Sequence, residues 1–171
     1  MMKSKKFIPM QSRIIGIDPG YERLGLAVLE MRSGNPVLIH SECFETSNKI
    51  TQGERLFFIS NYLDKIFKKF KPERVGIESL LFSKNVKTAM KVAEARGVIL
   101  TSSAKQNIVI SEYNPNTIKL AVTGYGKSDK KQIEIMLDKI LKIKKKIKYD
   151  DEYDAIAVAL TCSVIHKNSG N

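Results

Sequence analysis

Residues 13–30 read RIIGIDPGYERLGLAVLE, and this stretch sets the beginning of the fold. An apolar run over 13–19 ends at a Pro-Gly pair, and a second apolar run follows over 23–30. Two such runs separated by turn residues predict a β-hairpin. Asp18 ends the first run, where a carboxylate is costly to bury unless it binds a cation or hydrogen-bonds a turn. Because Asp before Pro-Gly is also a common turn residue, Asp18 alone does not decide between these roles.

The rest of the chain alternates between strand and helix patterns. Residues 36–46 alternate apolar and polar residues, which predicts a third strand, and residues 51–70 have apolar residues at helical spacing behind a Thr51/Glu54 capping box. Further elements are predicted as strands from Arg74 and over 107–113, and as helices over 85–104, 115–122, 129–142 and 151–166. This order predicts an α/β protein with a five-stranded mixed sheet and helices on both faces. The ribonuclease H-like fold is one of the few folds that share it.

A second carboxylate follows the same rule as Asp18. Glu78 closes the short apolar run 75–77 near the middle of the chain. If both strands lie in the centre of one sheet, their ends are neighbours, at the edge where open α/β sheets place their ligands. The alternative is that Glu78 only begins an exposed loop.

Two more carboxylates occur in the segment DDEYD at 150–154. Asp151 and Asp154 are three residues apart, so they share one face at the start of the last predicted helix. Helix capping and the helix dipole explain Asp150 or Asp151 well. They explain Asp154 poorly, because it leads into a stretch that is apolar all round and is therefore expected to be buried.

The candidate catalytic and metal-binding set is therefore Asp18, Glu78, Asp151 and Asp154. Four carboxylates held together repel one another unless divalent cations neutralise them, and oxygen ligands without a Cys or His cluster favour Mg²⁺ or Mn²⁺. Two Mg²⁺ ions at such a site are typical of phosphodiester cleavage. The net charge of +11 fits a polyanionic substrate that is brought to an acidic pocket.

The bulk properties bound the remaining possibilities. The 171 residues suit a single domain over 13–167, with a basic flexible leader at 1–12 and a tail at 168–171. No stretch approaches the roughly 20 apolar residues of a membrane span, so a cytoplasmic location is expected. Two cysteines predict buried, reduced thiols. The lysine-rich run over 139–148 predicts either a solvated surface or phosphate contact.

Several motifs, in order and at these spacings, resemble those of the RuvC family of Holliday-junction resolvases. They are GIDPG at 16–20, IES at 77–79 followed by LLFSKN, EARG at 94–97, GYGKSDKKQ at 124–132, and DDEYDAIAVA at 150–159. The resemblance extends from about Arg13 to His166. It implies a ribonuclease H-like nuclease that cuts four-way-junction DNA symmetrically as a homodimer, alongside the RuvA and RuvB branch-migration proteins.

The same resemblance assigns roles to individual residues. It implies that Asp18, Glu78, Asp151 and Asp154 are the metal-binding catalytic carboxylates. Lys119 and Lys130 are expected near the substrate phosphates. Leu81 and Phe82 correspond to the segment that wedges against bases at the junction, and either side chain could be the one that stacks.

Other classes of protein fit the sequence less well. Gly126-Lys127-Ser128 resembles the end of a P-loop, but Ala121 stands where that motif requires glycine. Actin-like and sugar kinases need two such domains. A RuvC-like nuclease acting on ribosomal RNA precursors, and a DNA-binding module that cleaves nothing, remain alternatives.

Overall fold

The computed structural model describes residues 12–79 and 86–168. Its strands are β1 (Arg13–Asp18), β2 (Arg23–Arg32), β3 (Asn35–Glu45), β4 (Arg74–Glu78) and β5 (Val109–Tyr113). Its helices are α1 (Gln52–Phe70), α2 (Val86–Lys105), α3 (Pro115–Thr123), α4 (Lys130–Leu141) and α5 (Asp150–Asn168). Every predicted element in the described ranges is confirmed, with ends that shift by one or two residues.

The strands form one five-stranded sheet in the order β3-β2-β1-β4-β5. β1, β2 and β3 are antiparallel neighbours, whereas β4 and β5 run parallel to β1. The predicted mixed sheet is therefore confirmed. The carboxyl ends of β1 and β4 meet at the same edge, because Ile17 pairs with Ile77.

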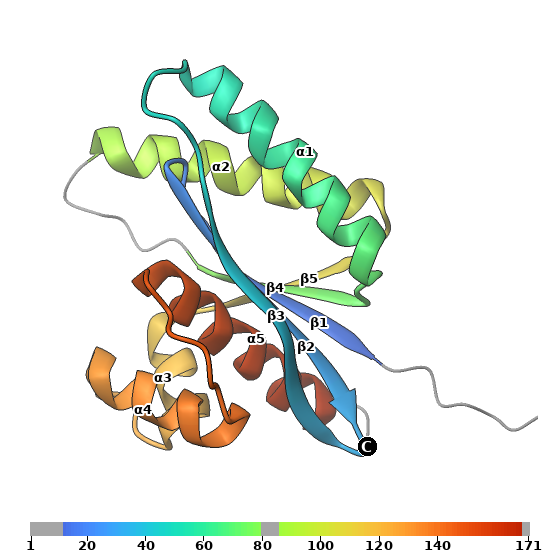
Figure 1. The fold of residues 1–171 in the computed structure, drawn as a ribbon, viewed down its shortest axis with the longest axis vertical. Coiled ribbons are helices and arrows are strands. Elements are labelled where there is room, and N and C mark those ends of the chain that lie inside the picture. The colour runs from blue at the N-terminus through green and yellow to red at the C-terminus, as the bar shows by residue number, and fades with distance from the viewer. Residues whose placement is uncertain (1–11, 80–85, 169–171) are drawn as a thin grey trace, which may run out of the picture.

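Helices cover both faces of this sheet (Figure 1). On one face α1 and α2 pack over a core that includes Ile15, Ile17 and Phe67. On the other face α5 lies against the strands, with α3 and α4 beyond it, over a core that includes Ile14 and Leu137. The period-two alternation of a strand explains why consecutive isoleucines of β1 enter different cores.

Local sequence sets where α1 begins and ends. The Thr51 side chain accepts a hydrogen bond from the backbone of Glu54, whose own side chain accepts one from the backbone of Thr51, so the predicted capping box is confirmed. The helix ends at Lys71, whose left-handed conformation lets its N–H donate to Phe67. In the described ranges no helix has the length and apolarity of a membrane-spanning segment.

The two cysteines are both free thiols. Cys162 is buried in α5, as expected, but Cys43 is only partly buried. The expectation of two buried thiols is therefore correct for one of them, because β3 is an edge strand and is covered less completely than the strands inside the sheet.

Candidate active site

Strand alternation directs Asp18 and Glu78 to the same face of the sheet. Gly16 of β1 and Gly76 of β4 are register partners, and both face α5. Residues two positions apart in a strand share a face, so Asp18 and Glu78 also face α5 at the carboxyl edge. The two predicted strand-end carboxylates thus lie on neighbouring strands.

Three glycines let α5 lie directly on this face of the sheet. A Cβ atom at Gly16 would overlap the backbone carbonyl of Ala155, and one at Gly25 would overlap the carbonyl of Asp151. At Gly76 it would come within 3.1 Å of the Cβ of Cys162. The backbone of α5 therefore contacts the strands, and its first turn is held beside the end of β1.

The carboxylates of α5 and of the two strands interact electrostatically. Burial, reinforced by the negative charges of Asp154, Asp151 and Glu78, raises the pKa of Asp18 from its ordinary value of 3.8 to about 7. Burial and the charge of Asp154 likewise raise the pKa of Glu78. Asp18 is thus the residue on which the repulsion of all three other carboxylates converges.

Lys130, the first residue of α4, partly neutralises this cluster. Its ammonium lies 3.2 Å from a carboxylate oxygen of Asp154 and 3.0 Å from one of Asp150. Burial raises the pKa of Asp154, and the nearby Lys130 opposes that rise. For Lys130 itself partial burial would lower the pKa, but the hydrogen bonds and charges of the two aspartates outweigh it and raise the pKa.

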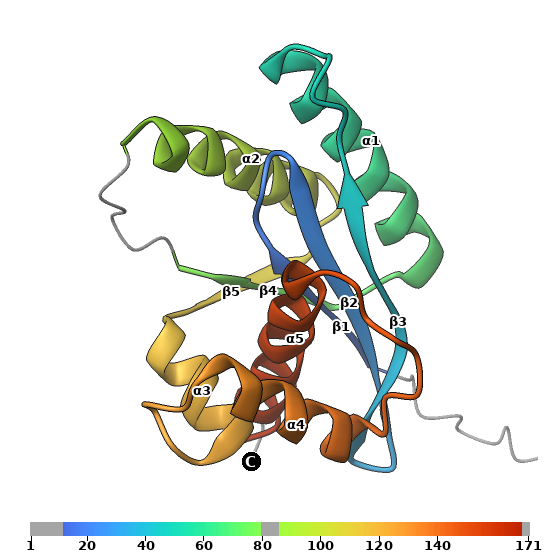
Figure 2. The ribbon, with the colours of Figure 1, turned by 60° about the vertical axis from the view of Figure 1, so that its left-hand side comes forward.

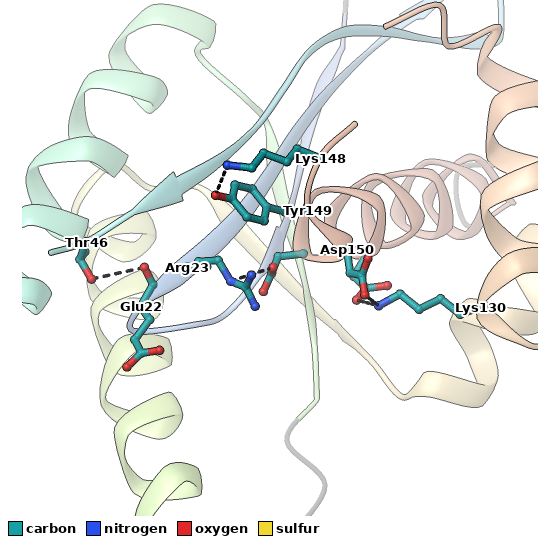
Figure 3. A network of polar contacts seen from close by, with 9 residues as sticks. Glu22, Arg23, Thr46, Lys130, Lys148, Tyr149 and Asp150 are labelled. Carbon is teal, nitrogen blue, oxygen red and sulfur yellow. Dashed lines mark hydrogen bonds and ion pairs between the residues drawn. The ribbon is translucent and has the colours of Figure 1, made fainter. Parts of the chain in front are cut away.

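Asp151 has a different cationic partner, which Figure 3 shows together with its neighbours. The Nε atom of Arg23 lies 3.3 Å from a carboxylate oxygen of Asp151. The same guanidinium lies over the ring of Tyr149, 5.2 Å from its centroid, and Lys148 donates a hydrogen bond to the Tyr149 hydroxyl. Both predicted carboxylates of α5 are therefore paired with a basic side chain.

These pairings bear on how the site could hold a metal ion. Within 12–79 and 86–168, no three His, Cys, Asp or Glu side chains are arranged so that they could hold one ion as they stand. The donors are nevertheless all carboxylate oxygens, the kind that Mg²⁺ and Mn²⁺ prefer, and all four interact at one edge of the sheet. The contacts with Arg23 and Lys130 each use one carboxylate oxygen of Asp151 and Asp154, so a cation would compete with these basic side chains for the two carboxylates.

The two lysines predicted near the substrate line a cavity of about 270 Å³ beside the carboxylates. Lys119 of α3 and Lys130 face it together with Glu78 and Asp154, and apolar residues complete the wall. The lysines of this cavity could bind a phosphate group, while its carboxylates would hold the cations that such a site implies. The predicted wedge residues, Leu81 and Phe82, lie outside the described residues.

Arg23 is the member of this site that the sequence reasoning missed. It lies on β2 two residues before Gly25, so strand alternation places it on the face that α5 covers. That signal was present in the sequence, but it could be used only with the knowledge that the glycine-bearing face carries α5. Helix capping or the helix dipole was expected to explain Asp150 or Asp151; the structure places Asp150 in the first turn of α5 and adds its ion pair with Lys130.

The sheet order, the helices on both faces and the carboxylates at the shared strand edge define a ribonuclease H-like α/β protein with an acidic site. Residues 14–162 match the family model described as "Crossover junction endodeoxyribonuclease RuvC". The chain belongs to the RuvC family. The sequence expectation on this point is confirmed.

Individual relatives agree with this assignment. The chain is 45% identical to the crossover junction endodeoxyribonuclease RuvC of Petrotoga mobilis over 85% of its own length and 90% of the relative. It is 40% identical to that of Fusobacterium nucleatum, over 87% of this chain and 78% of the relative. The solved structure of Thermus thermophilus RuvC in complex with Holliday junction substrate superposes with a TM-score of 0.87 at 29% identity, covering 92% of this chain and 96% of that one.

Proposed function

We propose that this protein is a crossover junction endodeoxyribonuclease that resolves Holliday junctions by metal-dependent hydrolysis of phosphodiester bonds. The products are a 5′-phosphate and a 3′-hydroxyl. The observation that carries the proposal is the convergence of four carboxylates at one end of the sheet in a protein of net charge +11. A carboxylate site of this kind fits nucleases in general, and membership of the RuvC family is the reason for proposing branched DNA as the substrate.

Asp18, Glu78, Asp151 and Asp154 are the proposed holders of two Mg²⁺ ions, which Mn²⁺ can replace. When bound, such ions supply an activated water and stabilise the charge that develops on the phosphate and on the departing oxygen. The protein contributes the arrangement of the carboxylates, because two of them end paired strands and the other two lie in the first two turns of a helix packed on those strands.

Lys119 and Lys130 are proposed to orient the substrate phosphates. Burial and Asp154 raise the pKa of Glu78, and both lysines oppose that rise, so their positive charges act at the carboxylate edge itself. Lys130 also holds Asp154 until a cation and substrate arrive. Leu81 and Phe82 remain the proposed wedge against junction bases.

A homodimer is proposed because a four-way junction has two strands of like polarity to cut. On α2, Ala93 is exposed and Ala89 and Val92 are half-buried, which leaves a small-residue face available for a second copy. Val98 of the same helix instead packs against the core under α1. RuvA and RuvB are the proposed branch-migration partners.

The test uses a labelled synthetic four-way junction and a linear duplex of the same sequence, each with Mg²⁺ or with chelator. Paired symmetric nicks in the junction are expected, with loss of cleavage in chelator and in the Asp18→Asn and Asp154→Asn variants. Asp64→Asn is the matched control, because this exposed aspartate lies on α1, on the opposite face of the sheet. The control should cut as the wild type does.

Two outcomes would overturn the proposal. A junction that is bound but left intact in both Mg²⁺ and Mn²⁺ would indicate a DNA-binding module without nuclease activity. Preferential cutting of structured RNA would indicate the ribosomal-RNA type of nuclease.

A further inference from the structure

The connection between α4 and α5, residues 142–149, carries exposed lysines that the active site does not use. Ile143 and Ile147 point inward and pack against the core beneath α5. The side chains between and beside them are exposed lysines, and together they form what we call the lysine strip: Lys142, Lys144, Lys146 and Lys148. All four side chains are exposed, and they lie on an irregular segment in which Lys142 is left-handed and the chain bends at Lys145.

The fold holds this connection in place. Lys145 forms an ion pair with the buried Glu152 of α5 and donates a hydrogen bond to the backbone carbonyl of Ser41 in β3. The connection runs beside β3 and leads to the beginning of α5 (Figure 2). The lysine strip is therefore presented by an anchored segment, with its position set before any partner binds.

The charges on the strip are mostly unbalanced. Within the described residues, Lys142, Lys144 and Lys146 have no hydrogen bond and no ion pair. Like charges at alternate positions of an anchored segment repel one another, and a polyanion relieves that repulsion. Nothing in the catalytic chemistry requires these three side chains.

The strip ends at the candidate active site. Lys148 donates a 2.6 Å hydrogen bond to the Tyr149 hydroxyl, and the Tyr149 ring lies under the guanidinium of Arg23, the partner of Asp151 (Figure 3). A continuous basic path thus leads from the end of α4 to the carboxylates. It measures at most roughly 20 Å in an extended chain.

We propose that the lysine strip binds the phosphate backbone of the duplex arm that leads into the active site. This inference rests on the proposed function and adds where the DNA lies on the protein. At its upper bound of roughly 20 Å, the strip would span no more than about six phosphates of one strand along a B-DNA axis. The strip has no aromatic side chain of its own on which unpaired bases could stack, so it suits a duplex backbone contacted without regard to sequence.

The experiment measures junction affinity in chelator, where no cleavage occurs, over a series of salt concentrations. The wild type is compared with the triple variant Lys142→Gln/Lys144→Gln/Lys146→Gln. The matched control is Lys65→Gln/Lys68→Gln/Lys105→Gln, which removes the same charge from exposed lysines of α1 and α2 on the other face. A backbone footprint of the bound junction locates the contact.

The logarithm of the affinity falls linearly with the logarithm of the salt concentration. For the strip variant the slope of this line is expected to be smaller in magnitude by about 3, because each lost phosphate contact removes about 0.9. The control should lose much less, and protection should disappear from one arm beside the cut site. Equal slopes for the two triple variants would overturn the inference. A decrease in slope that the strip variant shows with duplex RNA but not with the DNA junction would also overturn it. Cleavage by the wild type in Mg²⁺ is scored separately, so failure of the nuclease proposal and failure of the strip give different results.

Discussion

Gly25 of β2 and Asp151 of α5 lie so close that a Cβ atom on residue 25 would overlap the backbone carbonyl of Asp151. The first turn of α5 therefore takes its position from a residue with no side chain. Asp151 is in that turn and Asp154 begins the next one, so the geometry of the site depends on the packing of backbone against backbone.

Replacing Gly25 with alanine is expected to displace the start of α5 and to destabilise the protein by about 1–3 kcal/mol, as overpacking does in other cores. Thermal unfolding and junction cleavage together measure both effects. Gly97→Ala is the control, because nothing lies within 4 Å of a Cβ there and the change within α2 should stabilise by about 0.5–1 kcal/mol. Equal stability of the two variants would contradict the close contact.

Asp18 is expected to make the metal-free protein less stable as the pH rises. The pKa of Asp18 is about 7 in the folded protein and 3.8 ordinarily, so the folded state binds more protons between about pH 4 and pH 7. Stability falls with pH wherever the folded state holds more protons than the unfolded state. Asp18→Asn should therefore raise the melting temperature at pH 8, and the gain should shrink as the pH falls through 7 towards 5.

Melting curves in chelator across this range measure the effect. Glu45→Gln removes a negative charge from an exposed side chain at the end of β3 and serves as the control. A gain from Asp18→Asn that stays constant from pH 5 to pH 8 would show that burial and the neighbouring carboxylates do not raise the pKa of Asp18 in the folded protein.

Arg23 is expected to compete with divalent cations for Asp151. Its side chain is about half exposed, so the ion pair contributes no more than about 1 kcal/mol. Arg23→Gln should therefore bind Mn²⁺ about two- to fivefold more tightly in isothermal titration calorimetry. The control is Arg32→Gln, which removes an equally exposed arginine that pairs with Glu30. Unchanged or weaker binding by Arg23→Gln alone would mean that Arg23 does not occupy the place of the cation.

Lys130 and its neighbour Lys131 provide a matched pair of variants. Lys130 bonds to Asp154 and faces the cavity, whereas Lys131 is exposed at the next position of α4. A hydrogen bond from Lys130 to a charged substrate phosphate would contribute about 1.5–3 kcal/mol, so Lys130→Gln is expected to slow single-turnover cleavage by about 10- to 100-fold. Lys131→Gln should cleave within about twofold of the wild type. Similar cleavage rates for the two variants would show that Lys130 takes no part in cleavage.

The sequence by itself determined the order of the elements and the chemical identity of the candidate site. Asp18 and Glu78 each end a short apolar run, and Asp154 precedes an apolar helix where capping does not explain it. These are local signals, because strand alternation, helical spacing and capping involve residues only a few positions apart. They sufficed for the mixed sheet and for the four carboxylates as a set.

Only the tertiary structure decided how those carboxylates are held. The contact of Gly25 with α5, the pairing of Asp151 with Arg23 and that of Asp154 with Lys130 join segments more than twenty residues apart. Such contacts depend on which face of the sheet α5 covers and how closely it approaches. No local pattern encodes that distance, because it results from the packing of the whole core on both sides of the sheet.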